Sequence, residues 1–569
     1  MRHSIVSTLK KFFNKLSSTS KPSKHSLLYL NITQFSGVTN DNIFKFVMAF
    51  LLIDTLGHSA ASTILSATGA IYVLPFLLFS SSAGILADRF SKQKLLVLMK
   101  IAEMALMGLA AIAFAAKSVW GCYTLLFLVS THSALFGPSK YGIIPELVPA
   151  AAVSRANGLV TSFTYLAIIV GTFAASFFTE ITDRNFVLIA FLCLLIAICG
   201  FFSAIAIKQT PAQDSKKRIN LFFVREIFQT LQYARSIRHL LTAILGSSFF
   251  LMIGAFTQLN IIPFAIQSLN LSEVAGGYLF LATALGIALG AYLAGKASRK
   301  RIELGLSCLA GFGMALFFLL TALFSANLYA VIICLVAIGI LGGTFIVPFD
   351  TFIQLSSSNE KRGQTIAAAN FLSFTGVLIA SFLLYFFNAV CGLSSASSFA
   401  IIGVLTFLIS ITLSLRLSDL LLFYVARHIL YPLTKCAPPN TEAIEKASEV
   451  ILVLEEATWK NALLLAGALP NIHYLIPSGS KKWRWYHSYC YSLHKVVGEN
   501  QIKEILHSAN SYAQQGMIPC LMLEKKLPQK QRVFINTLLS LFKRPSNQLL
   551  YVRPVKDEPS GTTTLRFEK

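Results

Sequence analysis

The sequence predicts an all-α polytopic membrane protein with about twelve transmembrane helices in two six-helix repeats, followed by a small α/β domain. Of the 569 residues, 55% are hydrophobic and only 13% are charged, whereas soluble domains carry about 25% charged residues. Apolar stretches of the ~20 residues that a helix needs to cross a bilayer recur along the chain. They stop after Leu422, where the composition becomes polar. Together these observations predict a membrane domain with a polar tail.

Twelve stretches have the length and apolarity expected of spans. A hydrophilic segment rich in Lys and Arg separates the sixth stretch from the seventh, and the other connections are short. We therefore expect two bundles in which consecutive helices run antiparallel. The expected spans begin near Leu27, Ser59, Leu95, Val119, Ala151, Arg184, Leu240, Ala275, Ile302, Leu328, Gln364 and Ser397.

Composition divides the chain into five segments. The N-terminal segment is basic and lacks both an uninterrupted apolar core and a convincing cleavage site, so we interpret it as a cytoplasmic amphipathic leader. In the tail, the runs EVILVLE, IHYLIP, MIPCLML and LLYVRPV alternate with helical stretches and predict strands of an α/β domain. The segments are the leader 1–26, the first bundle 27–207, a basic cytoplasmic linker 208–239, the second bundle 240–422 and the cytoplasmic α/β domain 423–569.

The basic residues lie mostly in every second loop between the expected spans. Because Lys and Arg collect in cytoplasmic loops, we expect the even-numbered loops and both ends of the membrane domain to be cytoplasmic. This distribution explains the net charge of +23 without a nucleic-acid partner. The even-numbered loops hold Arg89, Lys92, Lys94, Lys140, Arg155, Lys208, Lys216, Lys217, Arg218, Arg225, Arg235, Arg238, Lys296, Arg299, Lys300, Arg301, Lys361 and Arg362, and the others hold Lys117 and Arg184.

The two expected bundles contain similar segments. SSAGILADRFSKQKLL after the second span matches ALGAYLAGKASRKRIEL after the eighth. A second pair aligns ALFGPSKYGIIPELV with GGTFIVPFDTFIQ, so that Pro138 corresponds to Pro348 and Lys140 to Asp350. Weak symmetry between six-helix halves is typical of transporters whose substrate site lies between the halves.

The turn after the second expected span contains Gly84, Asp88, Arg89, Lys92 and Lys94. This spacing closely resembles the signature GxLADRxGRK of the major facilitator superfamily, and the resemblance implies the major facilitator fold. We expect Asp88 to accept hydrogen bonds from a neighbouring helix and the basic residues to face anionic lipid. Breaking these contacts would accompany the movement of one bundle against the other.

Three stretches, QFSGVTNDNIFKF, FGPSKYGIIPELV and GGTFIVPFDTFIQ, together resemble the lysophospholipid transporter family. The resemblance implies a flippase that moves lysophosphatidylethanolamine and related lipids to the inner leaflet of a bacterial-type inner membrane. In that family, an acid of the first span and the lysine of the S-K-Y-G motif handle the head group, and these correspond to Asp41 and Lys140, beside Tyr141. The family also uses an arginine in the seventh helix, where this chain offers only Gln258 and Asn260.

The first expected span is unusually polar. Asp41 and Lys45 lie four residues apart and therefore share a helix face, and Asn40 and Asn42 extend the polar patch. Charged residues inside spans are costly and usually pair or function. One interpretation is an Asp41–Lys45 ion pair that only stabilises the bundle. The other is a patch that contacts a zwitterionic head group or relays a cation.

The third expected span contains a further acid, Glu103. It can pair with Lys100, one turn earlier on the same helix. The sequence leaves open whether this pair is structural or functional.

The tail window VILVLEEATWKNALLLAGAL resembles the catalytic region of glycerolipid acyltransferases, to which relatives of this transporter family are fused. Such domains use an H-x4-D box in which His acts as the base. Here Glu456 and Asn461 stand at the His and Asp positions, and Glu524 is what remains of the later F-P-E-G motif. We interpret the tail as a degenerate, inactive acyltransferase-like domain, with an unrelated α/β tail as the alternative.

The leading hypothesis is therefore a secondary transporter of lysophospholipids, with an acyltransferase as a partner enzyme. The alternatives are a bifunctional transporter and acyltransferase, an exporter of another amphipathic small molecule, and a scaffold that transports nothing. The chain has no P-loop, H-E-x-x-H or G-x-S-x-G motif, and its nine cysteines form no C-x-x-C pair. We therefore expect no cofactor and no metal, and neither an ATP-driven pump nor a soluble-type hydrolase.

Overall fold

The computed structural model of the protein describes residues 25–426 except 58–60, 213–222, 272 and 299–301. Beyond them it describes residue 428 and the segments 450–454, 461–462, 465, 472–476, 493–495, 518–522, 548–556 and 563–568. The chain forms two compact units, residues 1–302 with 307–411 and residues 303–306 with 412–569.

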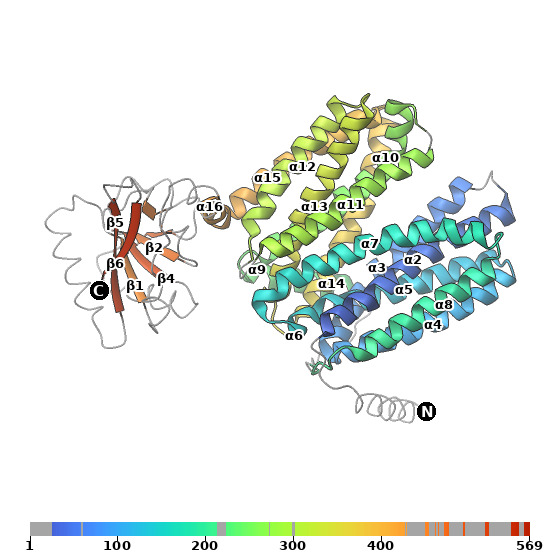
Figure 1. Cartoon of the computed structure of the whole chain (residues 1–569), viewed down its shortest axis with the longest axis horizontal. Coiled ribbons are helices and arrows are strands. Elements are labelled where there is room, and N and C mark those ends of the chain that lie inside the picture. Colours follow the sequence, from blue (N-terminus) through green and yellow to red (C-terminus); the bar gives the residue numbers. More distant parts are fainter. Residues whose placement is uncertain are drawn as a thin grey trace. The chain divides into compact units, whose positions relative to one another are not determined.

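The first unit is built from long helices in two groups, as expected, and each of the twelve expected spans corresponds to a helix that begins within a few residues of the predicted start. In Figure 1 the first group, coloured blue to teal, lies beside the second group, coloured green to orange. The first group consists of α2 (Ser26–Leu56), α3 (Ala61–Arg89), α4 (Lys92–Ala115), α5 (Val119–Gly142), the short α6 (Ile144–Leu147) and η2 (Ala150–Ala152), α7 (Val153–Ile181) and α8 (Phe186–Ala206). After α9 (Phe223–Ser236) come α10 (Leu240–Leu269), α11 (Glu273–Ala297), α12 (Leu304–Leu323), α13 (Leu328–Ser356), α14 (Arg362–Tyr385) with a π-helical turn (Phe386–Val390), and α15 (Ser395–Arg416).

Local sequence explains where several helices begin. The side chains of Ser118, Asn185 and Asn327 accept hydrogen bonds from the backbone N–H groups of Gly121, Leu188 and Ala330, and so cap α5, α8 and α13. An N-cap residue of this type satisfies a backbone donor that the helix itself leaves free.

Eleven helices of the described part are long and apolar enough to cross a membrane. The protein is therefore a multi-pass membrane protein. The helix α2 is not one of the eleven, although its 31 residues give it a length of ~46 Å at 1.5 Å per residue. Its polar residues lower its hydropathy, and two of them make hydrogen bonds to other helices inside the bundle. Gln34 donates to the carbonyl of Val160 in α7 at 2.8 Å, and Asn40 donates to the carbonyl of Cys193 in α8 at 3.0 Å.

Two helix pairs join the halves of the first unit. The helix α3 of the first group packs along α14 of the second, and α7 packs along α11. Both pairs combine helices from opposite repeats, and smaller contacts join α7 with α13 and α5 with α14. A movement of the halves against each other must change these contacts.

The second unit contains a six-stranded sheet with the order β3-β2-β4-β1-β5-β6, and a short helix α16 (Ser418–Val425). Strands β1 to β5 are parallel and β6 pairs with β5 in antiparallel fashion. The four strands predicted from the tail sequence are confirmed as β1, β2, β4 and β5, whereas β3 and β6 were not predicted. The strands are β1 (Val450–Leu454), β2 (Ile472–Ile476), β3 (Leu493–Lys495), β4 (Ile518–Met522), β5 (Gln548–Lys556) and β6 (Thr563–Glu568).

Candidate transport site

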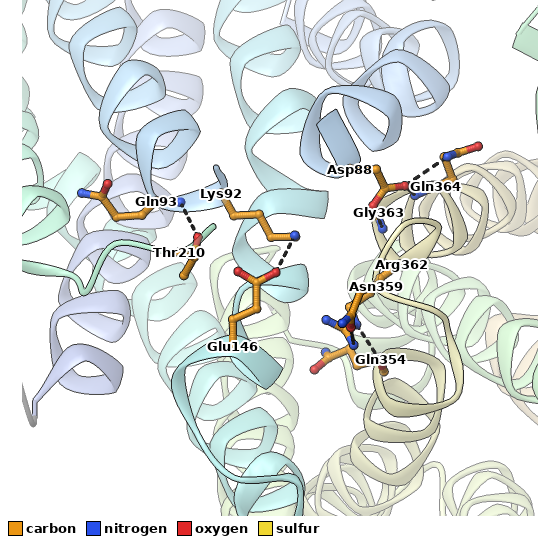
Figure 2. Close-up of polar contacts among 10 residues, drawn as sticks. All are labelled: Asp88, Lys92, Gln93, Glu146, Thr210, Gln354, Asn359, Arg362, Gly363 and Gln364. Atoms are coloured by element: carbon orange, nitrogen blue, oxygen red, sulfur yellow. Dashed lines mark hydrogen bonds and ion pairs between the residues drawn. The ribbon is translucent and has the colours of Figure 1, made fainter. Parts of the chain in front are cut away.

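The contact between α3 and α14 is a polar latch formed by Asp88. Figure 2 shows this carboxylate at the end of α3, facing the first residues of α14. The backbone N–H of Gly363 donates to Asp88 Oδ1 at 2.6 Å, and the backbone N–H of Gln364 donates to Oδ2 at 2.9 Å. The Gln364 side chain adds a third bond at 3.2 Å. A carboxylate at a helix N-terminus satisfies free N–H groups and interacts favourably with the helix dipole.

Two glycines let the helices of this latch approach closely. A Cβ atom on Gly84 would lie 2.7 Å from the Ala367 Cβ and 2.8 Å from the Gly363 carbonyl oxygen. A Cβ atom on Gly363 would lie 2.6 Å from the Gly84 carbonyl oxygen. The glycine and the acid of the signature therefore act together, because any side chain at Gly84 would push α14 away from Asp88.

An amide pair joins the halves near the latch. Gln354 of α13 and Asn157 of α7 donate to each other's side-chain oxygens at 2.9 and 3.1 Å. The carbonyl of Gln354 also accepts a hydrogen bond from the Arg362 guanidinium at 2.8 Å (Figure 2). Arg362 begins α14, so these contacts connect α7, α13 and the start of the latch helix.

The basic residues after α3 differ in their surroundings. Lys92 is buried and pairs with Glu146 of α6 at 2.6 Å (Figure 2). Lys94 is half-buried and Arg89 is exposed, with its guanidinium near the ring of Phe90. Lys92 therefore ties the first turn of α4 to the α5–α7 connection.

The second contact between the halves, α7 with α11, depends on glycine packing. A Cβ atom on Gly158 would lie 2.5 Å from the carbonyl oxygen of Ala291 and 2.8 Å from the Gly295 Cα. One turn further along α7, the Ser162 hydroxyl donates to the carbonyl of Ala288 at 2.7 Å. The backbones of α7 and α11 are thus in direct contact.

A cavity of about 230 Å³ lies between the two halves. It is lined by α5 and α7 from the first half and by α10, α13 and α14 from the second. Its wall is mostly apolar and aromatic, with several hydroxyl and amide groups. The lining residues are Tyr141, Thr161, Thr164, Tyr165, Ile168, Ser247, Phe250, Leu251, Ile346, Asp350, Ile353, Gln354, Ile366, Ala369, Asn370, Ser373 and Phe374.

Asp350 is the only charged residue among those that line this cavity. The Ser247 hydroxyl of α10 donates to Asp350 Oδ1 at 3.1 Å. The Lys140 ammonium interacts electrostatically with Asp350 and with Asp41. Lys140 is 8% exposed and lies 4.5 Å from the centre of the Tyr141 ring. Lys140 and Asp350, which correspond in the sequence repeat, thus interact across the two halves, while Pro138 and Pro348 are both buried inside their helices.

The polar residues of α2 do not line this cavity. Asp41 accepts a hydrogen bond from the Ser133 hydroxyl of α5 at 2.5 Å, and Asn42 donates to the carbonyl of Val38 at 2.8 Å. The ion pair between Asp41 and Lys45, one of the two interpretations of this span, is not formed. The Lys45 ammonium instead lies 4.8 and 5.5 Å from the ring centres of Phe46 and Tyr72. Aromatic faces attract cations, and this replaces a direct contact with Asp41, which acts on Lys45 only at longer range.

The expected pair of Lys100 and Glu103 is confirmed. Their side chains are fully buried and 2.6 Å apart. Ser36 accepts a further hydrogen bond from Lys100 at 3.1 Å, and Asn40 donates to Glu103 at 2.9 Å. Glycine makes room for this group, because a Cβ atom on Gly37 would lie 3.0 Å from the Lys100 ammonium. Asn40, which the sequence analysis placed in the polar patch of the first span, therefore belongs to a buried hydrogen-bond network that joins α2, α4 and α8.

The two residues of α10 considered in place of an arginine lie apart from the cavity. Gln258 is exposed. Asn260 is buried and donates to the carbonyl of Ser395 at 2.9 Å, which ties α10 to the start of α15. In the tail, Asn461 lies in a short helical segment, and Glu456 and Glu524 lie outside the described residues.

Comparison with known proteins identifies the fold family. The profile of the Major Facilitator Superfamily matches residues 30–381. The chain belongs to this superfamily. The human organic anion transporter MFSD10 has a similar solved structure, with a TM-score of 0.58 at 13% sequence identity, and the match covers 69% of this chain and 100% of that one.

Among superfamily members, the chain is similar to proteins named Lysophospholipid transporter LplT. It is 26% identical to the one from Serratia proteamaculans over 362 residues, which is 62% of this chain and 86% of that relative. It is 29% identical to the one from Escherichia coli O157:H7 over 345 residues, which is 60% of this chain and 81% of that relative.

Sequence reasoning missed most of the cavity of this superfamily member. Tyr165, Ser247 and Asn370 belong to no motif with a known role, and each lies among other polar residues of its helix, such as Thr164 and Ser248. The available signal was that these are polar groups inside spans, which usually face the bundle interior. This signal does not tell which of the many Ser, Thr and Asn residues meet at one place.

Proposed function

We propose that this major facilitator protein is a secondary transporter that moves lysophospholipids across a bacterial-type inner membrane by alternating access. The observation that carries the proposal is the cavity between the halves, which combines one carboxylate with hydroxyl, amide and aromatic groups. The similarity to proteins named lysophospholipid transporters supports the substrate class.

The size of the cavity suits a head group better than a whole lipid. Pockets for drug-sized ligands measure about 300–1,000 Å³, and this cavity measures about 230 Å³. A single acyl chain would then stay between the helices and the bilayer. Leaving it there avoids ~0.8 kcal/mol for each CH₂ group that would otherwise be moved into water.

In this proposal, Asp41 and Lys140 handle the head group, with Asn42 and Lys45 as secondary polar groups. Gln258 is exposed and Asn260 bonds to Ser395, so we do not assign these two residues of α10 to the head-group site. Lys140 supports the assignment best, because its side chain is buried and its ammonium interacts electrostatically with both Asp41 and Asp350. The motif around Gly84, Asp88, Arg89, Lys92 and Lys94, together with Pro138, Tyr141, Pro348 and Asp350, would control the change between conformations.

The test is uptake of labelled lysophosphatidylethanolamine by proteoliposomes that contain the full chain. We expect uptake by the wild type and a loss of at least about tenfold in Lys140→Ala, because a buried charge-assisted contact is worth ~1.5–3 kcal/mol. Lys117→Ala removes a lysine from a helix end away from the cavity and is the matched control. Absence of uptake by the wild-type protein would reject the proposal.

For orientation, we propose that the latch lies on the cytoplasmic side, with both ends of the membrane domain in the cytoplasm. The support is the concentration of Lys and Arg in the loops on the latch side. A C-terminal green fluorescent protein fusion should fluoresce, and a C-terminal alkaline phosphatase fusion should be inactive. The opposite pattern would reverse the orientation.

We further propose that an acyltransferase partner consumes the delivered lysolipid. The tail has Glu456 and Asn461 where the resemblance expects His and Asp, so it lacks the base of the known reaction. Proteoliposomes with the protein and an acyl donor should accumulate lysolipid without forming diacyl lipid. Formation of diacyl lipid by the purified chain would support a bifunctional protein instead.

A further inference from the structure

The residue with the most informative surroundings is Asp350, for which the sequence suggests only a conformational role. Its carboxylate lines the cavity between the halves. Within the described part of the chain, Asp350 has no ion-pair partner at 4 Å or less. In that part of the chain the Ser247 hydroxyl donates a hydrogen bond to Asp350, and Lys140 acts on Asp350 only at longer range, as it also does on Asp41. The charge of Asp350 is thus only partly compensated.

An uncompensated carboxylate away from bulk water is costly unless a ligand pairs with it. The other residues of the cavity wall are uncharged, so an anionic group placed beside Asp350 would meet repulsion and no nearby cation among the lining residues. A cationic group would meet a carboxylate. The cavity wall is therefore expected to favour cationic over anionic ligand groups.

The rest of the wall also suits a cation. Tyr141, Tyr165, Phe250 and Phe374 line the same cavity as Asp350. Aromatic rings attract ammonium groups through their electron-rich faces. The hydroxyl and amide oxygens of Thr161 and Asn370 provide acceptors for N–H donors.

We propose that Asp350 binds the ammonium group of the lysolipid head and makes this transporter selective for head groups that carry one. The inference rests on the proposed function and deepens it. The ammonium contacts Asp350 on the second half, and the phosphate extends past the cavity wall toward Lys140, which lies beside the lining residue Tyr141 on the first half. A zwitterionic head leaves the total charge of the site unchanged, whereas a head with only the phosphate adds one uncompensated negative charge.

This arrangement also gives the substrate a part in closing the site. Lys140 belongs to α5 and Asp350 to α13, so a head group that contacts both connects the two halves. A head group without the ammonium contacts only the first half and provides no such connection. Selectivity is therefore expected in the rate of transport as well as in binding.

The experiment measures uptake of three lysolipids with the same acyl chain by proteoliposomes of the full chain. Lysophosphatidylethanolamine carries a primary ammonium, lysophosphatidylcholine a quaternary ammonium, and lysophosphatidylglycerol none. We expect the wild type to take up lysophosphatidylethanolamine at least about tenfold faster than lysophosphatidylglycerol, as a charge-assisted contact allows. Equal uptake of the choline lipid assigns recognition to charge and aromatic faces, and slower uptake assigns it to N–H donation.

The decisive variant is Asp350→Asn, which keeps the shape and removes the charge. It should slow uptake of lysophosphatidylethanolamine about tenfold and leave lysophosphatidylglycerol unchanged or faster, so that the selectivity ratio falls toward one. Asp350→Glu should retain the preference for ammonium. The matched control is Asp54→Asn, which removes a carboxylate of α2 that pairs with Arg184 and does not line the cavity.

The outcomes separate the two proposals. If the wild type takes up no lysolipid, the proposed function fails and the inference fails with it. If the wild type transports lysolipids but Asp350→Asn slows all three equally, or if the wild type takes up lysophosphatidylglycerol as fast as lysophosphatidylethanolamine, the inference alone is wrong. A monodisperse size-exclusion profile of each variant shows that a lost activity does not come from misfolding, and Asp350→Glu tests the inference if Asp350→Asn does not fold.

Discussion

The two contacts that join the halves use different chemistry at equivalent places in the repeat. In the sequence LADR of the first half, Asp88 ends α3 and binds the start of α14 through three hydrogen bonds. In the matching LAGK of the second half, Gly295 stands in the place of the acid, and α11 packs directly on Gly158 of α7. One contact depends on a carboxylate and its hydrogen bonds, and the other depends on close backbone packing with a hydrogen bond from the Ser162 hydroxyl.

This difference indicates that the two contacts tolerate change differently. Water can replace hydrogen bonds to a carboxylate at modest cost, so the α3–α14 latch can open and close. Close backbone packing has no such substitute, because an added atom must displace the partner helix. We therefore infer that the α7–α11 contact keeps the halves together while the latch changes.

The largest expected effect comes from breaking the glycine contact. In Gly158→Val the new side chain meets the carbonyl oxygen of Ala291, which is 2.5 Å from the Cβ position. Overpacking of this kind costs about 3 kcal/mol. We expect a fall in Tm of roughly 5 °C or more in detergent and loss of uptake. Gly108→Val is the matched control, because nothing lies within 4 Å of its Cβ position, and an equal loss in both variants would contradict the packing argument.

The next effect comes from weakening the latch without breaking the fold. Asp88→Asn keeps one acceptor oxygen but removes the charge, which should destabilise the closed latch by about 2 kcal/mol. The measurement is the rate of maleimide labelling of Thr365→Cys, a buried position in the first turn of α14. We expect labelling at least about tenfold faster in the Asp88→Asn background. An unchanged rate would show that Asp88 does not hold the latch closed.

A smaller effect is expected from the amide pair between the halves. Gln354→Leu leaves the Asn157 oxygen without its partner and should cost about 1–2 kcal/mol. Labelling of the Thr365→Cys reporter should rise several-fold. The double variant with Asn157→Leu removes both partners and should lie closer to the parent than either single variant. Strictly additive effects would mean that the two amides do not act as a pair.

The smallest effect is expected at the exposed pair of Asp54 and Arg184, whose arginine side chain is 62% exposed. Exposed pairs contribute about 0–1 kcal/mol and are screened by salt. Asp54→Asn should therefore leave Tm nearly unchanged and should change the rate of lysolipid uptake by less than about twofold. A larger loss would show that this end of α2 takes part in transport.

The comparison also shows what the sequence could predict. Charge distribution, apolar length and the repeat predicted the twelve helices, and the signature predicted that Asp88 would meet a neighbouring helix. These features are local in sequence, or follow from symmetry. The strand β3 was missed because LHK is too short to show a period. The strand β6 was missed although Leu565 and Phe567 alternate with polar residues, because TTLRFE contains only these two apolar residues.

The cavity could be predicted only in part. The family resemblance singled out Lys140 and the alignment of the halves matched it to Asp350, but the position of Asp350 in the cavity wall was not predicted. The Asp41–Lys45 pair was one of two interpretations and rested on spacing alone. The structure places aromatic rings beside Lys45 and the Ser133 hydroxyl beside Asp41. Which partner a buried charge finds depends on helices distant in sequence, and spacing within one helix does not contain that information.

The most direct test of the account is to close the latch covalently and measure transport. Arg89 and Lys361 are both exposed and flank the Asp88 contact. In a background without the nine native cysteines, Arg89→Cys with Lys361→Cys can be joined by a short, reducible bis-thiosulfonate, with each single variant as the control. The account predicts that the cross-linked protein stops taking up lysophosphatidylethanolamine and that reduction restores uptake. Uptake at the uncross-linked rate while the cross-link is intact would contradict it.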